Sequence, residues 1–166
     1  MIKVGDKLPA GTLKEFIEVE TEGCSLGPNN VDVAGATAGK TIAVFALPGA
    51  FTPTCSAKHV PGFVNNFDAL KAKGVELIAC LSVNDAFVMG AWGKDQKADG
   101  KVVMLADGNA EFTKAIDLGF DASGFGLGYR SQRYAMVLED GVVKVLNVEK
   151  PGSFEVSKAE TILEAL

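Results

Sequence analysis

The stretch TIAVFALPGAFTPTC, from Thr41 to Cys55, decides how this chain folds. Its first seven residues are apolar enough to form a strand that is buried on both faces. Two prolines and a glycine then stop the strand, and an amphipathic pattern predicts a helix that begins at or just after Cys55. The sequence therefore predicts a strand, a short loop and a helix, with a cysteine where the helix starts.

This position predicts that Cys55 is a reactive thiol. The first N–H groups of a helix have no partners inside the helix, and they lie at the positive end of its dipole. Both features favour the thiolate, which attacks electrophiles, whereas a free cysteine loses its proton only near pH ~8.5. Pro48 and Pro53 are expected to fix the loop and to shield the sulfur from bulk water. A sulfur that is sealed from solvent would contradict this interpretation.

Length and composition indicate one globular domain over residues 1–166. The chain can bury a real core but is too short for two domains of ordinary size. Its net charge of -5 and the lack of a Lys/Arg cluster argue against a nucleic-acid surface. No segment approaches the roughly 20 apolar residues of a membrane span, and the N-terminus lacks a signal-peptide core. The predicted location is therefore the cytoplasm.

The cysteine and histidine content predicts reduced thiols and no metal or other cofactor. Three cysteines at irregular spacing, without a CxxC pair, do not form a disulfide framework. Cys24 lies in a polar turn and is expected to be a surface thiol, whereas Cys80 lies within a predicted buried strand and is expected to pack as a small hydrophobe. The only histidine, His59, could raise the local positive charge if protonated, but a structural hydrogen bond is the favoured interpretation.

Hydrophobic periodicity extends the pattern along the chain and predicts a mixed sheet with helices on both faces. A hairpin region is expected before residue 40, and the glycine-rich residues 119–128 are interpreted as a flexible connector rather than a phosphate loop. Cys55 falls at the C-terminal end of a strand, where α/β folds build their sites. The other expected elements are a helix of about four turns from Val60 to Leu70, a central strand at 75–83, a helix capped by Asn84 or Asp85, a strand at 101–106, a helix capped by Asn109, a hairpin of 134–139 and 142–148 around Asp140-Gly141, and a helix at 156–166.

Three polar residues are candidates to act beside the sulfur. A thiolate that attacks an O–O bond needs positive charge near both oxygens, and an arginine supplies it with several fixed donors. Arg130 and Arg133, the only arginines in the chain, both lie just before the strand that begins at residue 134. Thr52 lies three residues before Cys55, and its hydroxyl could orient a substrate oxygen.

The run PGAFTPTCSAKHVPGF, at residues 48–63, resembles the active-site signature of the peroxiredoxins, specifically their type II or atypical subfamily. The segments CLSVNDAFV (80–88) and RSQRYAMVLEDGVVKVLNVE (130–149) resemble two further parts of it, so that the resemblance covers about residues 40–150. It implies an α/β thioredoxin-like fold. It also implies a peroxide site that consists of Pro48, Thr52, Cys55 and Arg133, with Arg133 preferred to Arg130 because it directly precedes the aromatic residue that opens the strand.

The resemblance implies a thiol-dependent peroxidase that reduces hydrogen peroxide and organic hydroperoxides through a Cys55 sulfenic acid. Glutaredoxin with glutathione, or thioredoxin, would then reduce the sulfur. Cys80 matches a cysteine of plant type II members and could resolve the sulfenic acid, but a cycle with one cysteine is favoured. Members pair as homodimers through loops near the site, and Phe51 and Phe87 lie on candidate loops.

Two other functions stay open on the sequence. A thiol-disulfide oxidoreductase would use a second nearby cysteine, and the absence of a CxxC pair argues against it. A redox sensor would use the oxidation of Cys55 to change an interface instead of clearing peroxide.

Overall fold

The computed structural model describes residues 1–17 and 26–166, so that Cys24 lies outside the described residues. The strands are β1 (Thr12–Ile17), β2 (Gly27–Asp32), β3 (Thr41–Leu47), β4 (Leu77–Ser82), β5 (Val103–Ala106), β6 (Gly119–Asp121), β7 (Tyr129–Ser131), β8 (Tyr134–Glu139) and β9 (Val142–Val148). The helices are α1 (Val33–Thr37), α2 (Val60–Asn65), α3 (Phe67–Ala72), α4 (Ala86–Asp95), α5 (Glu111–Ala115) and α6 (Ala159–Ala165), with a π-helical turn η1 (Cys55–His59) and a 3-10 turn η2 (Ser123–Phe125).

The main sheet is mixed, as the sequence predicts. Its seven strands run in the order β2-β1-β5-β4-β3-β8-β9, which places β4 at the centre. Strands β3, β4 and β5 are parallel, whereas β8 pairs antiparallel with β3 and β9 antiparallel with β8. The loop after β3 therefore leaves the sheet beside the start of β8, and this topology brings residues 48–55 close to residue 133.

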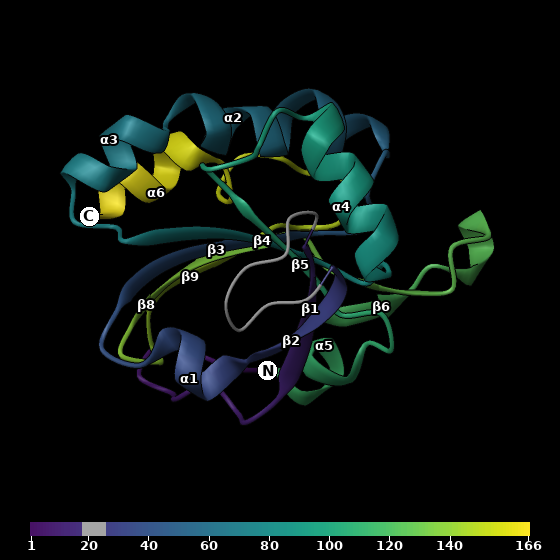
Figure 1. The fold of residues 1–166 in the computed structure, drawn as a ribbon, viewed down its shortest axis with the longest axis horizontal. Coiled ribbons are helices and arrows are strands. Elements are labelled where there is room, and N and C mark those ends of the chain that lie inside the picture. The colour runs from purple at the N-terminus through teal and green to yellow at the C-terminus, as the bar shows by residue number, and fades with distance from the viewer. Residues whose placement is uncertain (18–25) are drawn as a thin grey trace.

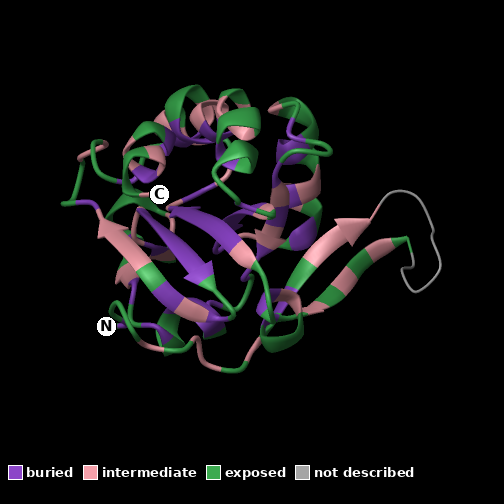
Figure 2. Ribbon diagram, turned by 90° about the vertical axis from the view of Figure 1, so that its left-hand side faces the viewer, coloured by how far each residue is buried: buried purple, intermediate pink, exposed green. Residues whose placement is uncertain are grey.

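Helices cover both faces of this sheet (Figure 1). Helices α2, α3, α4 and α6 lie on one face, and α1 and α5 lie on the other. Alternate residues of β3 enter two different cores, because Phe45 packs under the first group of helices and Val44 packs on the opposite side. Buried residues concentrate in the strands and on the helix faces turned toward them (Figure 2). The arrangement is the predicted thioredoxin-like α/β fold.

The helix that follows the cysteine is shorter than its pattern predicts. The expected four turns from Val60 to Leu70 break at Asn66, between α2 and α3. The Asn66 side chain donates to the Gly62 carbonyl at 2.8 Å, and the Asn66 backbone N–H uses the same acceptor at 3.1 Å. An asparagine competes in this way for backbone groups and interrupts the helix, although the apolar spacing continues.

The predictions for two other segments were wrong in detail. Asn109 does not cap α5; instead, the buried Asp107 carboxylate accepts the N–H groups of Phe112 and Thr113 at 3.3 and 2.8 Å. The glycine-rich residues 119–128 are not a plain connector, because β6 and β7 pair antiparallel within residues 119–131. Of the two candidate caps of α4, Asp85 is the one that accepts an N–H group, from Val88 at 2.8 Å.

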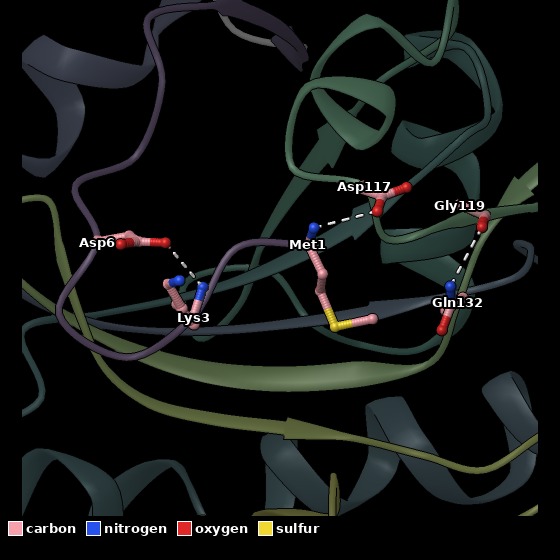
Figure 3. A network of polar contacts seen from close by, with 6 residues as sticks. All are labelled: Met1, Lys3, Asp6, Asp117, Gly119 and Gln132. Carbon is pink, nitrogen blue, oxygen red and sulfur yellow. Dashed lines mark hydrogen bonds and ion pairs between the residues drawn. The ribbon is translucent and has the colours of Figure 1, made fainter.

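Polar contacts hold the base of the β6–β7 hairpin beside the site (Figure 3). The Gln132 side chain donates to the Gly119 carbonyl at 3.2 Å, and the Gln132 N–H donates to the Leu118 carbonyl at 2.7 Å. Nearby, the Met1 ammonium group pairs with Asp117 at 3.1 Å. These contacts fix the chain on either side of Gln132, and both arginines lie within two residues of it.

Among the described residues, no helix has the length and apolar character needed to cross a membrane.

Candidate active site

Cys55 lies in the first turn of the helix that follows β3. Helical backbone already starts at Pro53, two residues before the predicted boundary, because a proline fits the first position of a helix. The turn from Cys55 to His59 is π-helical, and the Val60 N–H donates to the Cys55 carbonyl, five residues back. Such turns are rare and often occur at functional sites. Here the wider turn places Cys55 and His59 where both contact the same residue, Arg133.

Arg133 precedes β8. Its Nη2 donates to Cys55 Sγ at 3.1 Å, and its Nη1 donates to His59 Nδ1 at 2.8 Å. The guanidinium also lies 5.8 Å from the ring centre of Phe154. The structure thus brings Cys55 and Arg133 together as the sequence predicts, and one rigid fork contacts two side chains of the same helical turn.

His59 is neutral and structural. A guanidinium can only donate hydrogen bonds, so Nδ1 must accept from Arg133 and Nε2 must carry the proton that it shares with the Ser157 carbonyl at 3.1 Å. Burial of the ring, followed by the charge of Arg133, lowers the pKa of His59 to about 3. The structural interpretation of His59 is confirmed, and the ring adds no positive charge to the site near neutral pH.

The loop between β3 and the helix is held by Arg130. Its Nη1 donates to the Val83 carbonyl at 3.1 Å and to the Pro48 carbonyl at 3.4 Å, and its Nε donates to the Leu127 carbonyl at 2.9 Å. A side chain on Gly49 would lie 3.2 Å from the Arg130 guanidinium, which explains a glycine there. Arg130 is therefore not a free surface cation, because it ties the Cys55 loop to the end of β4.

Thr52 uses its hydroxyl within the loop. The group donates to the Gly49 carbonyl at 2.6 Å, so only its oxygen lone pairs remain for a substrate. The preceding residue, Phe51, has a φ of 62°, a left-handed conformation that is unusual for a bulky side chain. The orienting role of Thr52 toward a peroxide stays a prediction, and the structure restricts that role to accepting a hydrogen bond.

The sulfur is not open to solvent in this structure. Cys55 has 0% of its surface exposed, so the sulfur is sealed from solvent in this conformation, which is the result that counts against a reactive thiol. A cavity of about 480 Å³ nevertheless lies next to it, lined by Pro48, Thr54 and Arg133 together with residues of the β6–β7 hairpin and of the chain after β9. Arg133 both lines this cavity and contacts Sγ, so it connects the sulfur to the space that a substrate can enter.

Cys80 is buried in β4, as the sequence predicts. It has no exposed surface, lies opposite Phe45 of the neighbouring strand, and is a free thiol, as Cys55 is. Burial, followed by the nearby Cys55, raises the pKa of the Cys80 thiol. Both properties disfavour its thiolate.

Within the described residues, no cluster of histidine, cysteine and acidic side chains could hold a metal ion.

The sequence missed several residues that support the site. Trp92 is fully buried in α4 and donates from Nε1 to the Ser56 hydroxyl at 3.0 Å, next to the cysteine. Thr54 and Gln132 line the cavity. A buried tryptophan needs an acceptor for its N–H, and this is the only sequence signal that could have pointed toward Ser56.

Comparison with known proteins places the chain in a family. The redoxin family matches residues 3–163. Peroxiredoxin-2E, a chloroplastic protein of Arabidopsis thaliana, is 52% identical over 99% of this chain and 69% of its own length.

Two solved structures resemble the whole chain. The reduced Prx3 of Vibrio vulnificus in complex with H₂O₂ is 55% identical, covers 99% of both chains and superposes with a TM-score of 0.91. A crystal structure from Burkholderia cenocepacia, provisionally described as a thioredoxin reductase, is 58% identical over 100% of this chain and 98% of that chain, with a TM-score of 0.99.

Proposed function

The chain belongs to the redoxin family as one of its peroxiredoxins, and on this premise we propose that Cys55 is the sulfur that peroxide oxidises. The observation that carries the proposal is the 3.1 Å contact between Arg133 Nη2 and Cys55 Sγ. A guanidinium carries only donors, so it stabilises negative charge on the sulfur before the reaction and on the peroxide oxygens during it.

The reaction begins when the Cys55 thiolate attacks one oxygen of the peroxide. An S–O bond forms and the O–O bond breaks, so the sulfur is oxidised to a sulfenic acid and the peroxide is reduced. The leaving oxygen takes a proton to become water, or an alcohol when the substrate is an organic hydroperoxide. The Arg133 fork lies where charge develops on the leaving oxygen, and the Thr52 oxygen can accept a hydrogen bond from the peroxide.

Peroxide would reach the sulfur through the cavity beside Arg133. The cavity has apolar walls from Phe120, Phe125 and Pro151, which leave room for the alkyl group of an organic hydroperoxide. Because Cys55 itself has no exposed surface, the reaction requires a small displacement of Arg133 or of the first helical turn, which contains Thr54. A peroxide can replace the sulfur as acceptor for Arg133, and this exchange compensates for the displacement.

An external thiol then completes the cycle. It attacks the sulfenic acid and releases water, which leaves a mixed disulfide, and a second thiol breaks that disulfide to restore Cys55. Glutathione with glutaredoxin, or thioredoxin, is the proposed donor. The burial of Cys80 favours a cycle with one cysteine, because its attack on Cys55 would require part of β4 to open.

A homodimer is part of the proposal. Phe51, which lies on the loop before Cys55, is 54% exposed, and Phe87 is 64% exposed. Phe87 lies in the first turn of α4, so its expected place on a loop was wrong. Exposed aromatic side chains of this kind favour association. Phe87→Glu should therefore shift the protein toward the monomer in sedimentation experiments, whereas an unchanged oligomeric state would contradict this surface.

Steady-state turnover tests the proposed function. Purified protein is supplied with hydrogen peroxide or cumene hydroperoxide and with thioredoxin, glutaredoxin plus glutathione, or glutathione alone. The proposal predicts sustained consumption with at least one donor, lost in Cys55→Ser and retained in Cys80→Ser. A single oxidation event without turnover under any donor indicates a redox sensor. Disulfide reduction without peroxide consumption indicates a thiol-disulfide oxidoreductase.

A further inference from the structure

The residues after β9 form a closed loop over the site, from Glu149 to Ser157. The Glu149 side chain lies inside this loop and is 7% exposed. Its Oε2 accepts the N–H of Glu155 at 2.7 Å, the N–H of Ser157 at 2.9 Å and the hydroxyl of Ser157 at 2.7 Å. One carboxylate oxygen therefore ties the two ends of the loop together, and the loop tip at residues 150–153 lines the cavity.

The same contacts continue to the sulfur. The Ser157 carbonyl accepts the Nε2 proton of His59 at 3.1 Å, which leaves Nδ1 to accept from Arg133 at 2.8 Å. Arg133 then donates to Cys55 Sγ at 3.1 Å from its other terminal nitrogen. A continuous series of hydrogen bonds thus joins a buried carboxylate in the loop to the cysteine sulfur.

The direction of every bond in this series is fixed by chemistry. Arg133 can only donate, so His59 must accept at Nδ1 and must donate at Nε2. The acceptor at Nε2 is a carbonyl whose position depends on Ser157, and Glu149 holds that residue by both its N–H and its hydroxyl. The Glu149 N–H also donates to the Arg133 carbonyl at 2.9 Å, so the loop is attached to the arginine at its backbone as well.

We propose that Glu149 is a positioning residue for the peroxide reaction, acting through Ser157 and His59 to aim the Arg133 guanidinium at Cys55. The inference rests on the proposed function, because it assigns the reason that Arg133 faces the sulfur. Glu149 acts because its side chain is long enough to place a carboxylate oxygen where it accepts both hydrogen bonds from Ser157. Its negative charge is secondary, because it contacts neutral donors and lies beyond His59 from the arginine.

Two conservative variants separate reach from charge. Glu149→Gln keeps the length of the side chain and an acceptor oxygen but removes the charge. Glu149→Asp keeps the charge but shortens the side chain by one methylene group, so it cannot hold Ser157 in the same place. The matched control is Glu76→Asp, since Glu76 also accepts a backbone N–H, from Thr41 at 2.8 Å, but has no bond to this series.

The measurement is the second-order rate constant for oxidation of Cys55 by hydrogen peroxide, followed through the single tryptophan, Trp92. Misplacement of a catalytic group by about 1 Å costs on the order of 100-fold, so Glu149→Asp should lose between about 10-fold and 100-fold. Glu149→Gln should stay within about threefold of wild type, and so should Glu76→Asp. Reduction of oxidised Cys55 by a small thiol should change by less than about twofold in all variants.

Three results would overturn the inference. They are a wild-type rate in Glu149→Asp, an equal loss in Glu149→Gln and Glu149→Asp, or a parallel loss of the oxidation and reduction steps. The first result would show that Glu149 does not control the position of Arg133. The second would show that the charge of Glu149 matters and not its length. The third would show that the substitution disturbs the site as a whole. If wild type itself does not react with peroxide, the proposed function fails instead, and the two failures are thus distinguishable.

The only histidine, His59, supplies a spectroscopic signal that would not change if Glu149 only stabilised the fold. Nitrogen NMR of His59, the only imidazole in the chain, should report a proton on Nε2 and an acceptor at Nδ1 in wild type and in Glu149→Gln. In Glu149→Asp, the Nε2–H signal should shift or broaden with the loss of rate. An unchanged signal alongside a lost rate would also overturn the proposed series.

Discussion

Acid should destabilise this protein between pH 7 and pH 5, above the range in which most carboxylates titrate. Burial lowers the pKa of His59 from 6.5 to about 3, so between these values the unfolded chain binds a proton that the folded chain does not. The unfolding free energy then falls as the pH falls, by about 1.4 kcal/mol per unit inside this window. Integrated from pH 7 to pH 5, the loss is about 2 kcal/mol.

The assay is urea unfolding at the two pH values, followed by the fluorescence of Trp92. His59→Gln removes the titrating group, and its unfolding free energy should change by less than about 0.5 kcal/mol over the same interval. Glu15 acts in the opposite direction, because burial raises its pKa. Glu15→Gln should therefore lose more unfolding free energy between pH 7 and pH 5 than wild type, and the difference measures the contribution of Glu15. If wild type is equally stable at both pH values, or if His59→Gln loses as much as wild type, the neutral buried state of His59 is wrong.

Three further predictions concern the Cys55 loop. Arg130→Lys keeps the charge but cannot reach three carbonyls, so it should cost about 2 kcal/mol in urea unfolding; a cost below about 0.5 kcal/mol would show that these bonds do not stabilise the fold. Gly49→Ala should slow peroxide oxidation about tenfold by displacing Arg130 or Thr52, whereas Gly62→Ala, with no atom within 4 Å of the new carbon, should not; equal rates would refute the need for this close approach. A bulky maleimide should label Cys55 about 100-fold more slowly in the folded protein than in urea, as peptide mass spectrometry would report, and fast labelling would contradict its burial.

The sequence predicts best where local patterns and tertiary structure agree. The strand from Thr41 to Leu47 has the predicted boundaries, and the Asp140-Gly141 turn joins β8 and β9 with positive φ angles of 51° and 75°. The central place of β4 follows from its apolar residues, since only a strand covered on both faces can bury them all. The meeting of Arg133 and Cys55 was predicted from the family resemblance.

The features that the sequence could not predict depend on residues far apart in the chain. The carbonyls of Val83 and Pro48, which Arg130 contacts, lie 47 and 82 residues away from it, so no local spacing reveals the contact. The link between His59 and Ser157 spans 98 residues in the same way. The burial of Cys55 also depends on several elements that close around one helical turn. At Asn66 and Asp107, by contrast, side chains competed for backbone groups and shifted helix boundaries that periodicity alone cannot resolve.

Trapping of the oxidised sulfur tests the central claim most directly. Wild-type protein is mixed with one equivalent of hydrogen peroxide in the presence of dimedone, which captures sulfenic acids, and the labelled peptide is identified by mass spectrometry. We predict an adduct on Cys55 that is absent from Cys55→Ser and strongly reduced in Arg133→Met, which lacks the donor to Sγ. An adduct on Cys80 or Cys24 instead, or undiminished labelling of Cys55 without Arg133, would contradict the assignment of the site.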